Sequence, residues 1–260
     1  MITRAIGLQG RLEVAEHVFE IARQRPDARE LRLVFVSDFH AGPTLHARLL
    51  ADVLAAITDA EADLLLLGGD FVSFHARHVD KLLDSFRAAR APLGKFAVLG
   101  NHDLLGDDEY ITRQLVGAGV RVLVNENARL AAPFDDVWVC GFDDWDEGLP
   151  DAEKAFAGAD GTRIVLAHQP DALLAIGDRP FDIAFMGHVH GGQFLLRNRE
   201  PAIRHRGPVS KLYMHGGVFH SGSKDAPILV SRGVGTSTLP ARRQADPQVH
   251  ICRLVPKTSR

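Results

Sequence analysis

The fold is decided by the stretch Lys95-Phe96-Ala97-Val98-Leu99-Gly100-Asn101-His102-Asp103. Its first five residues form a short apolar run that predicts a buried strand, and a polar turn opens at Gly100. In open α/β folds ligands bind at the carboxyl ends of strands. Asn101 offers an oxygen ligand, His102 a titratable nitrogen and Asp103 a partner that can orient that nitrogen. The same residues also suit an ordinary turn with a surface histidine. The other segments of the chain must therefore distinguish a ligand-binding turn from an ordinary one.

The composition suits one large globular domain. The chain has 260 residues, of which 46% are hydrophobic and 24% are charged, which is ample for a sizeable core. A net charge of -3 provides no basic field that would attract nucleic acid. Cys140 and Cys252 stand far apart and no Cys-x-x-Cys pair occurs, so the sequence predicts no thiolate zinc site. The 13 histidines instead suggest a metal site with nitrogen ligands.

The N-terminal part is predicted to be helical. Apolar residues recur at steps of three and four over residues 8–24, which is typical of an amphipathic helix. We expect this helix to lie within residues 1–26 and to pack on the outside of a single domain spanning residues 1–260. The chain shows neither the apolar run of a secretory signal nor one long enough to cross a membrane. These features predict a cytoplasmic protein, with peripheral contact at the inner membrane left open.

Other apolar runs also end in metal-binding residue types. Three strand–polar turn–helix units follow one another, which indicates βαβ organisation and parallel strands. In extended chain residues i and i+2 point the same way, so Asp38 and His40 can bind one ion, and His188 and His190 share a face. The runs and the residues that follow them are 31–36 with Asp38 and His40, 63–67 with Asp70, 163–167 with His168, and 181–186 with His188 and His190.

The collected donors predict a metal centre rather than a series of turns. Two divalent ions need about this number of ligands, with one carboxylate that bridges them. Oxygen and imidazole donors without sulfur suit Mn, Fe or Zn. An unligated histidine beside the ions, His102, can protonate a leaving oxygen. The predicted ligands are Asp38, His40, Asp70, Asn101, His168, His188 and His190.

The sequence resembles the calcineurin-like metallophosphoesterases through five motif blocks that stand in the order of that family. Residues 187–193 and 213–240 further resemble a bacterial phosphodiesterase subgroup that includes UDP-2,3-diacylglucosamine pyrophosphatases. The resemblance implies an α/β fold, a four-layer α/β/β/α sandwich of two mixed sheets, with the site at the rim between the sheets. The blocks are Asp38-Phe39-His40, Gly69-Asp70, Gly100-Asn101-His102-Asp103, His168 and Gly187-His188-Val189-His190.

The resemblance also implies a role for each residue. His102 would be the general acid or the stabiliser of the transition state, oriented by Asp103, and Asp70 would bridge two divalent ions of Mn, Fe or Zn. The first ion would be held by Asp38, His40 and His190, and the second by Asn101, His168 and His188.

A dinuclear metal-dependent phosphoesterase is therefore the leading hypothesis. It would hydrolyse a phosphodiester or pyrophosphate bond by attack of a metal-bound hydroxide. One alternative within this class is a lipid enzyme like the UDP-2,3-diacylglucosamine pyrophosphatases, with a lipid-linked substrate. A nuclease is a second alternative, but the chain lacks a long basic stripe with interleaved aromatic residues. A non-catalytic, metal-stabilised interaction module is a third, and the presence of His102 argues against it.

Two segments that the strand and helix pattern explains least are expected to set specificity. Residues 141–160 contain an acidic run, which forms a solvated loop or lines the mouth of a pocket. Residues 194–224 contain a basic cluster, which forms a solvated face or binds anionic groups of the substrate. The basic residues are Arg197, Arg199, Arg204, Arg206 and Lys211.

Overall fold

The computed structural model describes residues 9–21, 29–198, 200–201, 207–221, 225–237 and 239–257, and these residues contain two mixed sheets of six strands each. In the first sheet, strands β2 to β5 run parallel and β12 runs antiparallel to β2. Its order is β1 (Glu13–Ile21), β12 (Gln248–Pro256), β2 (Leu31–Val36), β3 (Leu64–Leu67), β4 (Lys95–Ala97) and β5 (Arg121–Val122).

The second sheet has a parallel centre and antiparallel edges. Strands β11, β9, β8 and β7 are parallel, whereas β10 and β6 run antiparallel to their neighbours. Its order is β10 (Gly217–His220), β11 (Pro227–Val230), β9 (Ile183–Met186), β8 (Thr162–Leu166), β7 (Val137–Gly141) and β6 (Glu126–Arg129).

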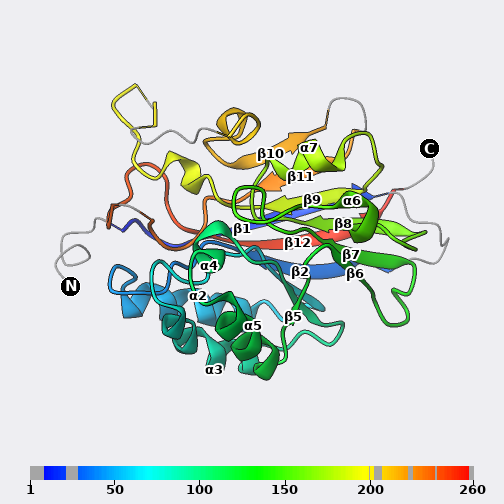
Figure 1. Cartoon of the computed structure of the whole chain (residues 1–260), viewed down its shortest axis with the longest axis horizontal. Coiled ribbons are helices and arrows are strands. Elements are labelled where there is room, and N and C mark those ends of the chain that lie inside the picture. The colour runs from blue at the N-terminus through cyan, green and yellow to red at the C-terminus, as the bar shows by residue number, and fades with distance from the viewer. Residues whose placement is uncertain are drawn as a thin grey trace.

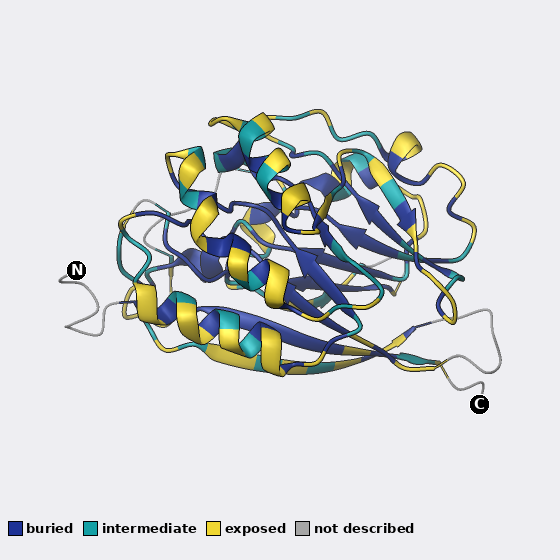
Figure 2. Cartoon of the chain, turned by 90° about the horizontal axis from the view of Figure 1, so that it is seen from below, coloured by how far each residue is buried: buried dark blue, intermediate teal, exposed yellow. Residues whose placement is uncertain are grey.

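Helices cover the outer faces of both sheets, which gives the predicted four layers (Figure 1). Each covering helix turns buried residues inward and exposed residues outward (Figure 2). Among the described residues, every helix is too short or too polar for a membrane span. The first sheet is covered by α2 (Ala47–Asp59), η1 (Ala76–Val79), α3 (Asp80–Ala88) and α5 (Asp108–Gly117), and the second by α6 (Ala152–Ala155) and α7 (Ala172–Ile176).

Three apolar cores hold these layers together. The middle core lies between the sheets, where Phe35 and Phe185 from opposite sheets meet with ring centroids 5.3 Å apart. The other two cores lie between each sheet and its helices. Strand β3 (Leu64–Leu67) consists of four leucines and is buried on both faces, which is typical of a central parallel strand. The cores fix the strand ends, and the strand ends position the site.

The helix predicted over residues 8–24 is wrong. Residues 13–21 form strand β1, which pairs in parallel with β12 at the edge of the first sheet, and residues 1–8 and 22–28 lie outside the described residues. The side chains of His17, Phe19 and Ile21 turn inward while Val18 and Glu20 are exposed, so the burial alternates with a period of two. The apolar steps of three and four were therefore a coincidence, and tertiary pairing with β12 decides the conformation.

A histidine pair fastens β1 to the sheet. Nε2 of His17 lies 3.1 Å from Nδ1 of His250 in β12, and Nε2 of His250 lies 3.1 Å from the hydroxyl of Ser231. Burial lowers the pKa of His250 to about 3, with the neighbouring His17 and Arg232 adding to the effect. The folded protein therefore keeps His250 neutral at a pH where the unfolded chain is protonated.

We expect the free energy of unfolding to fall as the pH drops, because only the unfolded chain takes up a proton at His250 between pH 6.5 and pH 3. From a pH of about 7 to about 5 this group alone should cost about 2 kcal/mol. Urea unfolding at both pH values should show the loss in the wild type and a smaller loss in His250→Gln. The exposed His215→Gln is the matched control, and an undiminished loss in His250→Gln would contradict this account.

Candidate metal centre

The predicted ligands follow the carboxyl ends of five strands, three from the first sheet and two from the second. Because these five strands run parallel to their ligand-bearing neighbours in each sheet, their ends meet at one rim between the sheets (Figure 1). Asp38 and His40 follow β2, Asp70 follows β3, Asn101 and His102 open the short helix α4 (Asn101–Leu104) after β4, His168 follows β8, and His188 and His190 follow β9.

Left-handed backbone, rather than extended chain, brings these side chains together. Residues other than glycine adopt this conformation rarely, at a cost of roughly 1–3 kcal/mol each. Hydrogen bonds between loops hold it: the Asp38 amide donates to the Gly69 carbonyl and the His40 amide to the Asp70 carbonyl, both at 2.9 Å. The i, i+2 argument is thus wrong in its geometry: Asp38 and His40 do come together, whereas His190 joins their group and His188 lies against His168. The angle φ is 54° at Asp38, 45° at His40, 53° at Asp70, 71° at His188 and 51° at His190.

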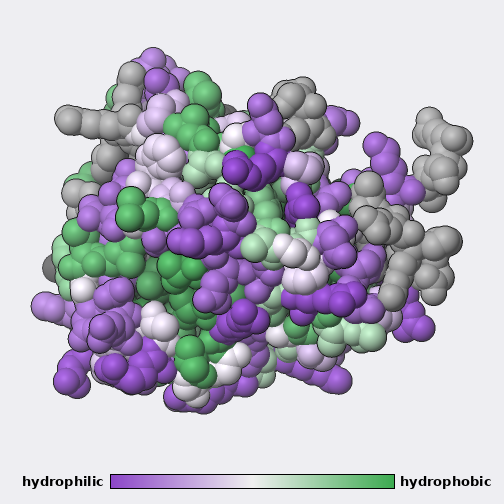
Figure 3. Space-filling view, turned by 45° about the vertical axis from the view of Figure 1, so that its right-hand side comes forward, coloured by the Kyte–Doolittle hydropathy of each residue, from purple (hydrophilic) through white to green (hydrophobic). Residues whose placement is uncertain are grey.

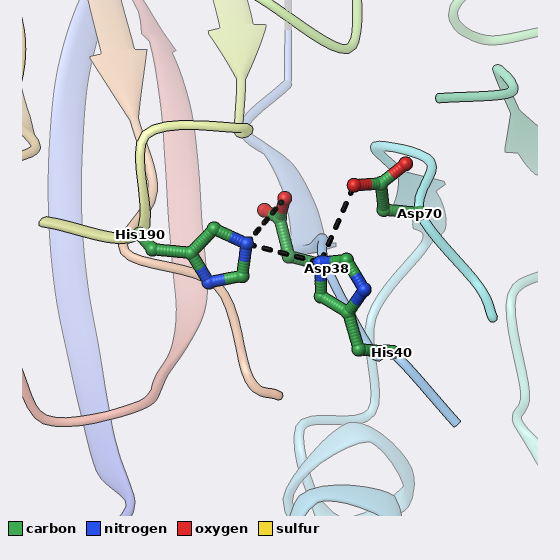
Figure 4. A group of neighbouring side chains, drawn as sticks. All are labelled: Asp38, His40, Asp70 and His190. Carbon is green, nitrogen blue, oxygen red and sulfur yellow. Dashed lines mark hydrogen bonds and ion pairs between the residues drawn. The ribbon is translucent and has the colours of Figure 1, made fainter. Parts of the chain in front are cut away.

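Four of the predicted ligands form one buried group, which Figure 4 shows. Asp38, His40, Asp70 and His190 each offer a ligand atom, and these atoms all lie within 4.8 Å of one another. Nε2 of His40 lies 3.0 Å from Nε2 of His190 and 3.3 Å from Oδ2 of Asp70. Nε2 of His190 lies 3.6 Å from Oδ1 of Asp38. Two carboxylates and two imidazoles at this spacing can hold a divalent cation.

A second group of donors also approaches Asp70. Its Oδ2, which approaches His40, also lies 3.4 Å from Nε2 of His168. Nδ1 of His188 lies 3.3 Å from that same nitrogen of His168. The Asp70 carboxylate therefore stands between the two groups.

The donor chemistry of this second group fits a cation. Nδ1 of His168 lies 2.8 Å from the Gly68 carbonyl, to which it can only donate, so Nε2 is left as the ligand atom. Oδ1 of Asn101 is buried and has no hydrogen-bond partner. A buried amide oxygen without a partner is costly, and a cation would satisfy it. The side chains around Asp70 therefore fit a divalent metal centre.

The buried charges of the site also favour binding of a cation. Burial raises the pKa of Asp38 to about 6 and, together with the neighbouring Asp70, that of Asp103 to about 8. Burial lowers the pKa of His40 to about 3, so this ring is a neutral donor. Burial also opposes the charges of Asp70 and His168, but their mutual attraction prevails: it lowers the pKa of Asp70 and raises that of His168. A bound cation would supply the positive charge that the buried carboxylates lack.

His102 lies beside the metal centre, but Asp103 does not orient it. The ring of His102 meets the His40 ring edge-on, with centroids 4.8 Å apart, and its Nδ1 lies 3.1 Å from the Ser73 carbonyl. The Asp103 carboxylate instead accepts the amides of Gly100 and Val72, at 3.0 and 3.2 Å. The expected contact between Asp103 and His102 is therefore absent from this part of the chain: Asp103 caps the turn, and a main-chain carbonyl holds the ring.

Residues 231–237 form a wall of the site to which the sequence alone assigns no position. The Val234 amide donates to the Ser37 carbonyl at 3.1 Å, which places this loop directly against Asp38. Gly233 has a φ of 66°, and a Cβ atom there would lie 2.5 Å from the Asp38 Cβ. Only a glycine permits this approach, and pairing between segments about 200 residues apart leaves no local signal in the sequence.

The two segments expected to set specificity are only partly described. In the acidic run, Asp144 is buried and accepts the amides of Asp146 and Glu147 and the side-chain amide of Gln169. The Asp144 carboxylate thus fastens this turn to the residue after His168, while Asp146 and Glu147 are exposed. Of the basic cluster, Arg199, Arg204 and Arg206 lie outside the described residues.

Comparison with known proteins agrees with this geometry. The family model described as "Calcineurin-like phosphoesterase superfamily domain" matches residues 31–201. The chain is 28% identical over 249 residues to "Uncharacterized metallophosphoesterase YkuE" of Bacillus subtilis, covering 94% of this chain and 85% of that protein. It is 31% identical over 250 residues to "Phosphodiesterase YaeI" of Escherichia coli, covering 91% and 88%.

A third relative is longer. The chain is 28% identical over 237 residues to an "Uncharacterized metallophosphoesterase" of Helicobacter pylori, covering 88% of this chain and 61% of that protein. The matched domain, the named relatives and the buried Asp and His group support a metal-dependent phosphoric ester hydrolase. The chain belongs to the calcineurin-like phosphoesterase superfamily.

Proposed function

We propose that this chain is a dinuclear enzyme that hydrolyses a phosphodiester or pyrophosphate bond. The observation that carries the proposal is the position of Asp70: its Oδ2 lies 3.3 Å from the His40 nitrogen on one side and 3.4 Å from the His168 nitrogen on the other. A carboxylate between two sets of donors is what a bridging ligand of two ions requires.

The side chains divide into two coordination sets around that bridge. One set, Asp38, His40 and His190, lies in the group within 4.8 Å. The other would consist of Asn101, His168 and His188, supported by the unpartnered Asn101 oxygen and by the short His168–His188 distance. Nitrogen and oxygen donors of this kind suit Mn, Fe or Zn.

The residues have separate tasks in hydrolysis. Two bound divalent ions supply Lewis-acid polarisation of the phosphoryl oxygens and activate water at neutral pH. In its imidazolium form His102 could donate the Nε2 proton to the leaving oxygen, because Nδ1 donates to the Ser73 carbonyl and Nε2 has no hydrogen bond within the described residues. Asp103 keeps the turn that presents His102 in place through the Gly100 amide. The Escherichia coli relative carries the name phosphodiesterase, which supports the choice of a diester.

A lipid-linked substrate is favoured by one specific observation. Phe74 is 69% exposed and follows Ser73, the residue whose carbonyl holds His102. Leu105 is 67% exposed and directly follows α4, which carries Asn101 and His102. Exposed apolar side chains also gather between polar ones on the face shown in Figure 3. Two large apolar side chains beside the candidate acid would suit a substrate with an acyl chain.

We expect the purified protein to contain a divalent metal and to cleave bis-p-nitrophenyl phosphate. Metal analysis and a colorimetric assay with Mn, Fe and Zn supplied in turn would measure both. A protein that binds metal but cleaves no phosphate ester with any of them would favour the interaction module over the enzyme.

A substrate screen would then separate the enzymatic alternatives. Phosphomonoesters, short diesters, a diacylated nucleotide sugar and single-stranded DNA should be compared at equal concentration. We expect diesters or pyrophosphates to be cleaved fastest. Preference for the diacylated compound that Phe74→Ser abolishes would support the lipid enzyme, whereas preference for DNA would support the nuclease.

A further inference from the structure

Arg242 is a buried arginine that touches a predicted metal ligand. Its residue surface is only 4% exposed. Nη2 lies 3.2 Å from Nδ1 of His190, and Nη1 donates to the His190 carbonyl at 3.3 Å. Because an arginine only donates and a histidine that binds metal through Nε2 keeps its proton on Nδ1, the ring contact is a packing contact, and the restraint on His190 comes from the hydrogen bond to its carbonyl.

The remaining contacts of Arg242 fasten two further segments of the site. Its guanidinium donates to the carbonyls of Arg232 at 2.7 Å, Gly235 at 2.9 Å and Ala245 at 2.8 Å. Arg232 and Gly235 flank the loop that packs on Asp38 and His40. The planar fork of an arginine can make several such bonds at fixed angles, which a lysine cannot.

This cation has no carboxylate within hydrogen-bond distance among the described residues. Burying a guanidinium is costly, and the nearby charges of Asp38 and Asp246 offset only part of that cost. All hydrogen bonds of this buried side chain go to three loops that surround His190. We therefore attribute the cost of its burial to the need to hold this predicted ligand in place.

We propose that Arg242 is a positioning residue of the metal centre, which fixes His190 so that its Nε2 faces Asp38 and His40. His190 has a left-handed backbone, with φ 51°, in the short turn η2 (His190–Gly192). This residue lies in a short turn, and the hydrogen bond from the guanidinium to its carbonyl adds a restraint on its main chain. Residues that orient a metal ligand from behind typically change metal affinity by roughly 10–100-fold when they are replaced.

The inference rests on the metal centre of the proposed function but not on the reaction. Metal binding can be measured without a substrate. A wild-type protein that binds metal and cleaves no phosphate ester would overturn the proposed function and leave this inference intact.

The test compares Arg242→Gln with Arg163→Gln. Arg163 is a matched control, because its guanidinium also donates to main-chain carbonyls, those of Ala159 and Pro180, but it contacts no predicted ligand. Isothermal titration with Mn²⁺ and the absorption spectrum of the Co²⁺-loaded protein would be recorded for each folded variant. We expect Arg242→Gln to lower the affinity for one of the two ions by roughly 10–100-fold and to alter the Co²⁺ spectrum. Arg163→Gln should change neither the affinity nor the spectrum.

A role in folding alone predicts a different result. Arg242→Gln would then lower the melting temperature as Arg163→Gln does, while the metal affinity and the Co²⁺ spectrum of the folded protein would stay those of the wild type, and the proposal would be overturned. Equal weakening by both variants would overturn it as well.

Two further measurements cover an Arg242→Gln variant that does not fold. Arg242→Lys keeps the positive charge but loses the planar guanidinium, so it should lower the affinity for the same ion. Wild-type affinity in a folded Arg242→Lys variant would contradict the proposal. In the unchanged chain, the side-chain NMR signals of Arg242 should shift on metal loading and those of Arg163 should not. Arg242 signals that stay in place would count against the proposal even if neither variant folds.

Discussion

Asp70→Ala should remove both divalent ions from the purified protein and, with them, all measurable hydrolysis. The Asp70 carboxylate lies against side-chain nitrogens of both sets of donors, at 3.3 Å from His40 and 3.4 Å from His168. Without it, each set keeps at most three ligands, and the two sets no longer share a negative charge. Metal analysis of the dialysed protein would measure the loss directly.

Asp182→Ala is the matched control for this variant. Asp182 is a largely buried carboxylate that accepts the Arg163 amide at 2.7 Å, and it lies just before β9, at the end of that strand opposite to His188. The Asp182→Ala variant should have a lower free energy of unfolding than the wild type and an unchanged metal content. An Asp70→Ala protein that still carries two ions would show that Asp70 does not bridge them.

His102→Ala should lower the turnover number by roughly 10²–10⁴-fold, the range expected when a general acid is removed, and should retain both ions. The ring contacts the Ser73 carbonyl and the His40 ring but is not among the proposed ligands. Steady-state kinetics and metal analysis on the same preparation would separate the two properties. His75→Ala, an exposed histidine two residues after Ser73, is the control.

The leaving group provides a sharper test of the same residue. If His102 protonates the leaving oxygen, the defect should shrink for a substrate with an acidic leaving group such as p-nitrophenol, and grow for an alkyl diester. Unchanged turnover on both substrates would remove His102 from the mechanism. Loss of metal together with activity would make it a ligand or a structural residue instead.

The sequence predicts the central strands and the polar turns that follow them well, because both depend on local signals. A buried parallel strand is a short apolar run, as in Leu64–Leu67, and its ligand follows within a few residues, as Asp70 does. All five apolar runs that precede the predicted ligands are therefore strands: β2 has the predicted bounds, and β3, β4, β8 and β9 lie within two residues of theirs.

The failures have a common physical cause, which is that distant partners decide the local structure. Strand β1 was predicted as a helix because its pairing with β12, more than 200 residues away, leaves no trace in its own sequence. Asp103 was expected to orient His102, but the amides of Val72 and Gly100 compete for its carboxylate and prevail. Arg242 could not be found, because a buried cation bound to carbonyls has no sequence signature.

Anomalous diffraction from a crystal of the Mn²⁺-loaded protein tests the central claim most directly. The account predicts two anomalous peaks that share Asp70, one bounded by Asp38, His40 and His190 and the other by Asn101, His168 and His188. A single peak, or two peaks of which either lies away from Asp70, would contradict a dinuclear centre bridged by this carboxylate.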